Sequence, residues 1–235
     1  MTTVAIAGST GLTVSLLQYP GGSNILSTLS NVSNVNTIHA FARRDLPAGA
    51  KLTAIVSTDS ATWAARYPSD AQLFFSALGT TRAAAGGVEG QRKVDHDLAL
   101  ELAKAAKAAG TRAYVLISSS GASSTSPLAY PKMKGELEEA VKALNFDHTV
   151  ILRPGLIVGE RAEARAFEVV LRKTAIFMGG VGGNRFKDFW AQDVDVIAKA
   201  AVRAGMDCIE GKEVEKVKLL SQSDIVQLGR TEWKA

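Results

Sequence analysis

Cysteine, histidine and long apolar runs are scarce in this chain of 235 residues, and each scarcity excludes a class of protein. The single cysteine, Cys208, cannot form an internal disulfide, which favours a reducing compartment. The 3 histidines show no ligand spacing, so we expect no metal site. No apolar run reaches the roughly 18 residues of a membrane span, and the first residues resemble a core strand rather than a signal or transit peptide.

Charge is also modest and dispersed. The chain has 27 Lys and Arg against 23 Asp and Glu, a formal net charge of +4 without a run of like charges. We expect weak attraction for an anionic ligand or membrane surface and no nucleic-acid partner. Hydrophobic residues make up 46%, enough for a sizeable core. Because no linker divides the chain, we expect a single domain over residues 1–235, with a small C-terminal substrate-side portion from about residue 155.

Short apolar runs alternate with helical patterns along the chain. Most of the runs are continuously apolar, as in strands that are covered on both faces. The predicted strands are Val4–Ala7, Thr37–Ala42, Leu52–Val56, Leu73–Ala77, Tyr114–Ile117, Thr149–Leu152 and Val214–Leu219. The predicted helices are Val94–Ala109, Tyr130–Leu144 with a Glu138/Lys142 pair, Val194–Ala204, and Ser221–Leu228 with Ser221 and Asp224 in a capping box. The alternation predicts an α/β fold with a doubly wound parallel sheet, the Rossmann fold.

The first strand leads into a glycine turn, Gly8-Ser9-Thr10-Gly11-Leu12. In a dinucleotide-binding unit such a turn lets the backbone approach a pyrophosphate, which the amides of the next helix then hold. The expected third glycine is missing, because Val14 stands at its position. Either Val14 replaces it, or Gly22 is the third glycine and the loop is enlarged. We favour Gly22, since Pro20-Gly21-Gly22 would interrupt a continuous helix.

The second strand is followed by two arginines, Arg43 and Arg44. Sites that prefer NAD place a carboxylate there to accept from the ribose 2′-hydroxyl, whereas guanidinium groups suit a 2′-phosphate. The sequence therefore predicts NADP(H) as the cofactor.

Tyr130 and Lys134 stand four positions apart at the start of a predicted helix, so they share one face. An ammonium group near a phenol stabilises the phenolate, which is the basis of acid/base chemistry by tyrosine. The preceding strand ends in a serine cluster that begins Ser118-Ser119. The pattern predicts an acid/base site formed by the tyrosine and the lysine, next to this serine cluster.

Together these motifs resemble the short-chain dehydrogenase/reductase family. The resemblance implies that Tyr130 exchanges the proton, that Lys134 modulates it and binds the nicotinamide ribose, and that Ser119 or Ser118 orients the substrate carbonyl. It also implies that Pro154-Gly155 lies beside the nicotinamide and that Leu78-Gly79-Thr80-Thr81 lines the adenosine side. One departure is Asp95, which stands where many members have an asparagine on the central helix.

The ordered combination of motifs narrows the resemblance to an atypical branch, the Tat-interactive-protein-like oxidoreductases and their fungal counterparts at the mitochondrial outer membrane. The resemblance implies a monomer or a homodimer that is cytoplasmic or peripheral on the mitochondrial outer membrane. The leading hypothesis is an NADPH-dependent oxidoreductase that reduces a carbonyl on a small molecule. The alternative is an NADP(H)-binding scaffold or redox-sensing protein with little or no turnover. Residues 155–167 and 179–189 are the expected substrate-facing segments.

Overall fold

A parallel sheet dominates the computed structural model, which describes residues 1–8, 25–158 and 191–233. The sheet has seven strands in the order β3-β2-β1-β4-β5-β6-β9, and every neighbouring pair is parallel. The strands are β1 (Thr2–Ala7), β2 (Val35–Ala42), β3 (Leu52–Val56), β4 (Leu73–Ser76), β5 (Ala113–Ile117), β6 (His148–Leu152) and β9 (Val217–Leu220). The predicted doubly wound Rossmann fold is confirmed, with the strand order reversing between β1 and β4.

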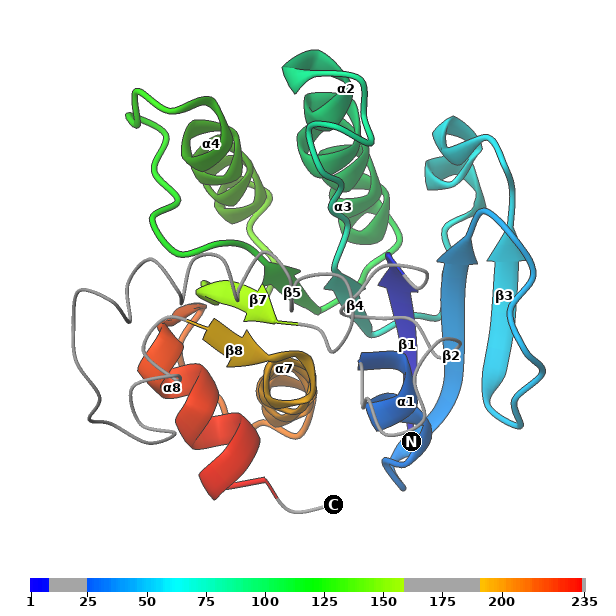
Figure 1. Ribbon diagram of the computed structural model, residues 1–235. Helices are drawn as coiled ribbons and strands as arrows, with labels where there is room; N and C mark the ends of the chain where they lie inside the picture. Colours follow the sequence, from blue (N-terminus) through cyan, green and yellow to red (C-terminus); the bar gives the residue numbers. More distant parts are fainter. Residues whose placement is uncertain (9–24, 159–190, 234–235) are drawn as a thin grey trace.

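Helices cover both faces of the sheet (Figure 1). One face carries α2 (Val88–Arg92), the π-helical turn η3 (Lys93–Leu98), α3 (Ala99–Ala108) and α4 (Ala129–Ala143), and the other carries α1 (Ile25–Ser30), α7 (Val194–Ile209) and α8 (Gln222–Val226). Every residue of β4 and β5 is buried as a result. This double coverage explains why the central strands are continuously apolar rather than alternating.

The structure differs from the sequence prediction in several elements. The helix predicted over Val94–Ala109 begins earlier and is interrupted by η3, and the helix predicted over Val194–Ala204 continues to Ile209. Two short strands and two turns were not predicted: the parallel pair β7 (Leu156–Val158) and β8 (Ala191–Asp193), and the 3₁₀ turns η1 (Ser60–Thr62) and η2 (Ala64–Arg66). The predicted capping box of Ser221 and Asp224 is confirmed at the start of α8, which runs into the π-helical turn η4 (Gln227–Thr231).

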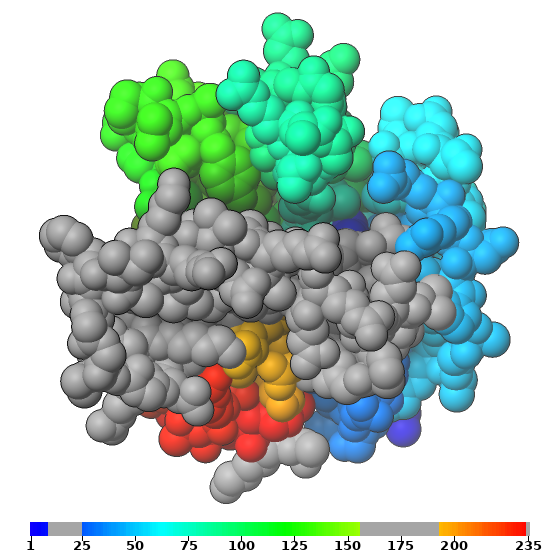
Figure 2. Space-filling model, in the orientation of Figure 1, coloured from blue at the N-terminus to red at the C-terminus, as the bar shows by residue number. Residues whose placement is uncertain are grey.

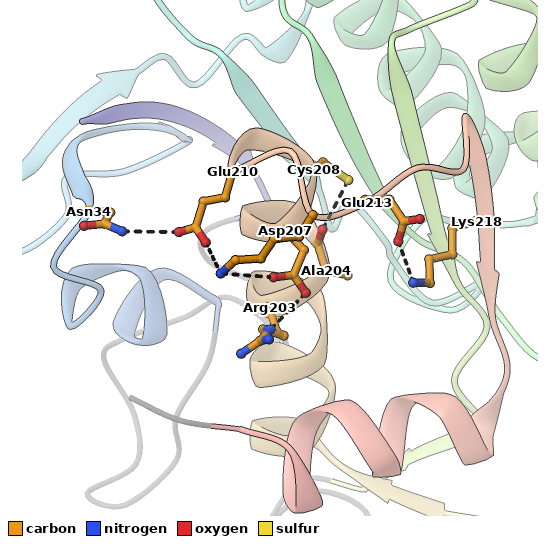
Figure 3. A network of polar contacts seen from close by, with 9 residues as sticks. Asn34, Arg203, Ala204, Asp207, Cys208, Glu210, Glu213 and Lys218 are labelled. Carbon is orange, nitrogen blue, oxygen red and sulfur yellow. Dashed lines mark hydrogen bonds and ion pairs between the residues drawn. The ribbon is translucent and has the colours of Figure 1, made fainter.

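A polar network joins the end of α7 and the residues after it to β9 and to the residue before β2 (Figure 3). Asn34, just before β2, donates to Glu210 at 3.2 Å, and Lys218 of β9 pairs with Glu213 at 2.5 Å. The buried Cys208 thiol lies on the same turns and donates to the Ala204 carbonyl at 3.2 Å. Burial raises the pKa of this thiol to about 12, so it is an inert part of the packing.

In the space-filling view, α8 and the α2–α3 region lie on opposite sides of the molecule (Figure 2). No helix among residues 1–8, 25–158 and 191–233 is long and apolar enough to cross a membrane. Several predicted positions lie outside the described residues, namely Ser9, Thr10, Gly11, Leu12 and Gly22 of the glycine turn, and nearly all of the expected substrate-facing segments.

Candidate functional site

The predicted site residues follow the carboxyl ends of neighbouring strands. Gly8 follows β1, Arg43 follows β2, Leu78 lies just beyond β4, Ser118 follows β5 and Arg153 follows β6. In a parallel sheet all these ends lie at one edge, and the edge opens where the strand order reverses, here between β1 and β4. The fold therefore gathers residues from distant parts of the chain at the place where open α/β sheets bind their ligands.

Gly8 occupies a position that only glycine fits. Its φ is +97°, and a β-carbon at this residue would lie 2.4 Å from the carbonyl oxygen of Ala77, which follows β4. The absence of a side chain thus lets the turn after β1 pass directly against the end of β4. This agrees with the role predicted for the first glycine of a dinucleotide-binding turn, the tight turn itself.

The Leu78–Thr81 segment continues from β4 and is held by two side chains from the neighbouring helix. The backbone N–H of Thr80 donates to Asp95 Oδ1 at 2.7 Å, and the Thr80 carbonyl accepts from Gln91 Nε2 at 2.9 Å. Leu78 is buried, whereas Gly79 and Thr81 are exposed. The segment predicted to line the adenosine side therefore has a fixed backbone and an accessible surface.

Arg43 and Arg44 are both exposed directly after β2. Because β2 pairs with β1, with Phe41 opposite Ala7, the arginines lie next to the turn that begins at Gly8. Neither arginine forms an ion pair with another residue in the part of the chain that the structure describes. Two exposed arginine residues thus follow the strand next to Gly8, the first residue of the predicted pyrophosphate turn.

Tyr130 and Lys134 lie in the first turns of α4, whose N-cap residue is Leu128. Pro131 fits there because the first turn of a helix needs no amide donor. Tyr130 is 41% exposed, whereas Lys134 is 2% exposed and donates from Nζ to the carbonyl of Ile117 at 3.2 Å. This hydrogen bond holds the lysine side chain at the end of β5, whereas the tyrosine side chain is exposed.

Three ionisable groups of this region influence one another. Burial lowers the pKa of Lys134, and the negative charges of Asp95 and Glu138 oppose that shift. Burial raises the pKa of Asp95, against the effects of Lys134 and of the Thr80 amide. Partial burial and the charge of Asp95 raise the pKa of Tyr130, against hydrogen bonding with Ser119. The raised pKa keeps the phenol protonated at neutral pH and makes it a weaker acid than an exposed tyrosine.

The two candidate serines have different surroundings. Ser118 is buried, and its hydroxyl donates to Glu138 Oε1 at 2.5 Å. Ser119 is half-buried, its hydroxyl donates to the Ser120 carbonyl at 3.3 Å, and hydrogen bonding with it lowers the pKa of Tyr130. The structure thus brings Ser119 together with Tyr130 and engages Ser118 elsewhere.

A buried ion pair behind the serines was not predicted. Glu138 is fully buried and accepts from Arg153, with Nε at 3.1 Å from Oε1 and Nη2 at 2.5 Å from Oε2. The predicted Glu138/Lys142 pair is wrong, because Lys142 pairs instead with Glu139 at 2.9 Å. Glu138 points inward on the face that Lys134 occupies one turn earlier. That shared i, i+4 face was the signal in the sequence that could have identified it.

Backbone contacts join the serine segment to its neighbours. The amide of Ser118 donates to Leu152 and that of Ser120 to Pro154, each at 2.8 Å, so the serines run alongside the predicted Pro154-Gly155 segment. The Ser120 hydroxyl also accepts from Gln222 of α8 at 3.1 Å. The same loop crosses α4 closely at Gly135, where a β-carbon would lie 2.2 Å from backbone atoms of Ser123 and Ser124. This close approach of the serine loop to α4 thus requires glycine at position 135.

Comparison with solved structures shows that other proteins share this fold. The fold resembles MoeE5 in complex with UDP-glucose and NAD, with a TM-score of 0.66 and 16% identity over 98% of this chain and 81% of that one. It also resembles a short chain dehydrogenase family protein from Francisella tularensis, with a TM-score of 0.60 and 12% identity over 97% of this chain and 100% of the other. At these identities the likeness shows a shared fold alone.

The sequence is much more similar to that of a fungal protein than to those of these solved structures. The HIM1 family model matches residues 53–178. Protein fmp52, mitochondrial, of Aspergillus clavatus is 49% identical over 240 residues, which cover 97% of this chain and 99% of that protein. The chain therefore belongs to the HIM1 family, together with the fungal mitochondrial fmp52 proteins.

Proposed function

We propose that this chain is an NADP(H)-dependent oxidoreductase that reduces a carbonyl group on a small molecule. The observation that carries the proposal is the grouping of Tyr130, Lys134 and Ser119 at the carboxyl edge of the sheet, beside the turns that follow β1 and β4. A phenol, a lysine on the same helix face and a serine hydroxyl are the groups that carbonyl protonation needs.

The residues present fit a phosphorylated dinucleotide. The tight turn at Gly8 and the fixed Leu78–Thr81 backbone border the crevice where such ligands bind, and Arg43 with Arg44 supplies cations for a 2′-phosphate. By family resemblance, Lys134 would hold the nicotinamide ribose and Pro154-Gly155 would lie beside the ring. The cofactor, when bound, supplies the hydride.

The chain's own residues then bind the carbonyl oxygen and supply the proton. Ser119 donates a hydrogen bond to that oxygen, and Tyr130 transfers its phenolic proton to it. The positive charge of Lys134 stabilises the phenolate that remains. Ser118 is not suited to the role of Ser119, since its hydroxyl is engaged by Glu138.

Cofactor binding is tested by titrating the protein with NADPH and with NADH and following nicotinamide fluorescence. We expect tighter binding of NADPH, and a loss of about tenfold or more in the Arg43→Ala/Arg44→Ala variant because charge-assisted hydrogen bonds to phosphate are lost. Lys104→Ala/Arg112→Ala is the matched control, since it removes two exposed cations away from the site. Equal NADPH affinity of the first double variant and the parent would refute the cofactor assignment.

Turnover is tested with a panel of aldehydes and ketones and NADPH. Replacing a general acid commonly costs about 100- to 10,000-fold, so we expect a loss of that order in Tyr130→Phe. Ser119→Ala should lower kcat more than Ser118→Ala does. A protein that binds NADPH but consumes no carbonyl substrate would instead support the scaffold or redox-sensing function.

We also propose that the chain associates peripherally with the mitochondrial outer membrane. Its relative fmp52 is named a mitochondrial protein, which favours this location over a freely cytoplasmic one. The test is subcellular fractionation of a tagged chain followed by alkaline carbonate extraction. We expect the tagged chain in the mitochondrial fraction. Carbonate should release it, and protease added to intact organelles should digest it. Recovery in the cytosolic fraction alone would contradict the proposal.

A further inference from the structure

Glu138 of α4 is a buried carboxylate on which two other segments of the chain converge. Its side chain is 1% exposed, Oε1 accepts from the Ser118 hydroxyl at 2.5 Å and from Arg153 Nε at 3.1 Å, and Oε2 accepts from Arg153 Nη2 at 2.5 Å. Ser118 follows β5 and Arg153 follows β6, the strand that pairs with β5. One side chain of α4 therefore bonds the ends of two neighbouring strands at the carboxyl edge of the sheet.

Backbone pairing between these two segments continues past the ends of the strands. The amide of Ser118 donates to Leu152 and that of Ser120 donates to Pro154, each at 2.8 Å, with the alternation of a parallel ladder. The serines therefore stay beside the segment that leads to Gly155. The two segments that the proposed function places around the carbonyl and the nicotinamide are thus held next to each other.

The register of the strands explains how one carboxylate reaches both ends. Leu116 is paired with Ile151, and both belong to a buried cluster shared with α4. Side chains two positions further along a strand point to the same face, which places Ser118 and Arg153 on the α4 side of the sheet. The same alternation directs Ser119, the next residue, away from Glu138.

The same face of α4 makes a second contact with the end of β5. Lys134, one turn before Glu138, donates from Nζ to the carbonyl of Ile117 at 3.2 Å. The next residue along the chain is Ser118, whose hydroxyl Glu138 accepts. These two contacts fix the serine segment relative to the helix whose first turn contains Tyr130.

A carboxylate suits this junction better than a neutral side chain. It accepts hydrogen bonds only, and it has lone pairs for all three donors that it meets here. An amide in its place would present N–H groups to these donors, and the guanidinium of Arg153 has no acceptor. The Ser118 hydroxyl has a single proton and gives it to Glu138, so it has none for a substrate oxygen.

We propose that Glu138 is a positioning residue that joins the ends of β5 and β6, uses the Ser118 hydroxyl as the connecting group, and thereby leaves Ser119 to bind the substrate carbonyl. In the proposed function, on which this inference rests, Ser119 and Tyr130 meet the carbonyl oxygen. The two adjacent serines thus have unequal roles, since one holds the strand end and the other contacts the substrate. Loss of the connection should loosen the serine segment and leave the sheet beneath it intact.

Four variants separate this role from a general contribution to stability. Ser118→Ala removes only the hydroxyl that connects β5, whereas Ser118→Thr keeps a hydroxyl at that place. Glu138→Leu removes both connections at a similar side-chain volume. Glu139→Leu is the matched control, since Glu139 lies one position away on α4 but is exposed and pairs with Lys142.

Exchange of the Ser118 and Ser120 amides with deuterium, followed by nuclear magnetic resonance, reports whether the serine segment is held. We expect both amides to exchange about tenfold faster or more in Ser118→Ala and in Glu138→Leu, because a hydrogen bond to a charged group is lost. The rates should stay near those of the parent in Ser118→Thr and in Glu139→Leu. The amide of Val115, inside β5, should keep its parent rate in Ser118→Ala.

The functional readouts are kcat with a carbonyl substrate and the affinity for NADPH. We expect Ser118→Ala to lower kcat about tenfold, because a displaced serine segment no longer orients the carbonyl. NADPH affinity should stay at the parent value, and Ser118→Thr should restore kcat. A purely structural role would instead lower both quantities together.

Failure of this inference and failure of the proposed function give different results. Unchanged exchange at Ser118 and Ser120 in both Ser118→Ala and Glu138→Leu overturns the positioning role. Equal acceleration at Val115 in Ser118→Ala also overturns it, because the loss is then one of global stability. A parent protein that neither binds NADPH nor reduces a carbonyl overturns the proposed function, whereas the exchange rates still decide whether Glu138 holds the serine segment.

Discussion

Removing Arg153 should destabilise the protein more than the loss of an ordinary surface ion pair. In Arg153→Met the carboxylate of Glu138, whose side chain is 1% exposed, loses two charge-assisted hydrogen bonds and its only ion-pair partner among the described residues. Breaking a buried pair by removing one partner costs about 3–5 kcal/mol. We expect the lower end, about 3 kcal/mol, because Arg153 is itself 31% exposed.

The assay is urea unfolding followed by circular dichroism, with thermal unfolding as a check. For a chain of this length, ~3 kcal/mol corresponds to a fall of roughly 6–12 °C in Tm. The double variant Glu138→Gln/Arg153→Met should recover much of the loss, since the neutral amide can still accept from Ser118. A cost below about 1 kcal/mol for Arg153→Met, the range of exposed pairs, would refute the reasoning. A double variant as unstable as Arg153→Met would also refute the reasoning.

Three further outcomes follow from other parts of the fold. Gly8→Ala should lose about 1–3 kcal/mol of stability in urea unfolding and weaken NADPH binding, since φ is +97° and the Ala77 carbonyl is in the way; unchanged values would contradict the tight turn. Cys208 should resist thiol reagents until the protein is denatured, because burial raises its pKa to about 12; equal labelling of native and denatured protein would be inconsistent with that burial. Burial opposes the low pKa of Glu213, but hydrogen bonds from Lys218 and backbone amides outweigh it. The contribution of this pair is therefore present above the usual pKa of 4.5 and lost as pH falls through the lower folded value, so the Tm difference between the parent and Glu213→Gln should shrink on acidification.

Much of the fold could be predicted because each central strand has its own local signal. A strand covered on both faces is continuously apolar, and β4 and β5 are so at every position but one, Ser76. The strands β7 and β8 have three residues each, too few for any periodicity to be recognised. Their pairing depends on contacts between residues far apart in the sequence, which no local pattern records.

The candidate site could be predicted in its residue types and less well in its contacts. Tyr130 and Lys134 were visible because their spacing places them on one helix face. The partner of Glu138 was not, because several basic residues lie within reach on α4 and the actual partner, Arg153, follows a later strand. The choice between Ser118 and Ser119 likewise depends on which hydroxyl meets Glu138, a property of the packed core rather than of the serine cluster.

The outermost strand gives the protein a particular order of assembly. Each strand of the seven-stranded sheet after β1 pairs with a strand that is made earlier, and β9 is made last, well after β6, the strand with which it pairs. Only then can Leu220 accept from the Arg153 amide and Gln222 reach Ser120. A nascent chain thus carries Tyr130 and Lys134 long before the supporting edge exists, and one shortened before β9 would keep these residues while losing the strand that completes their surroundings.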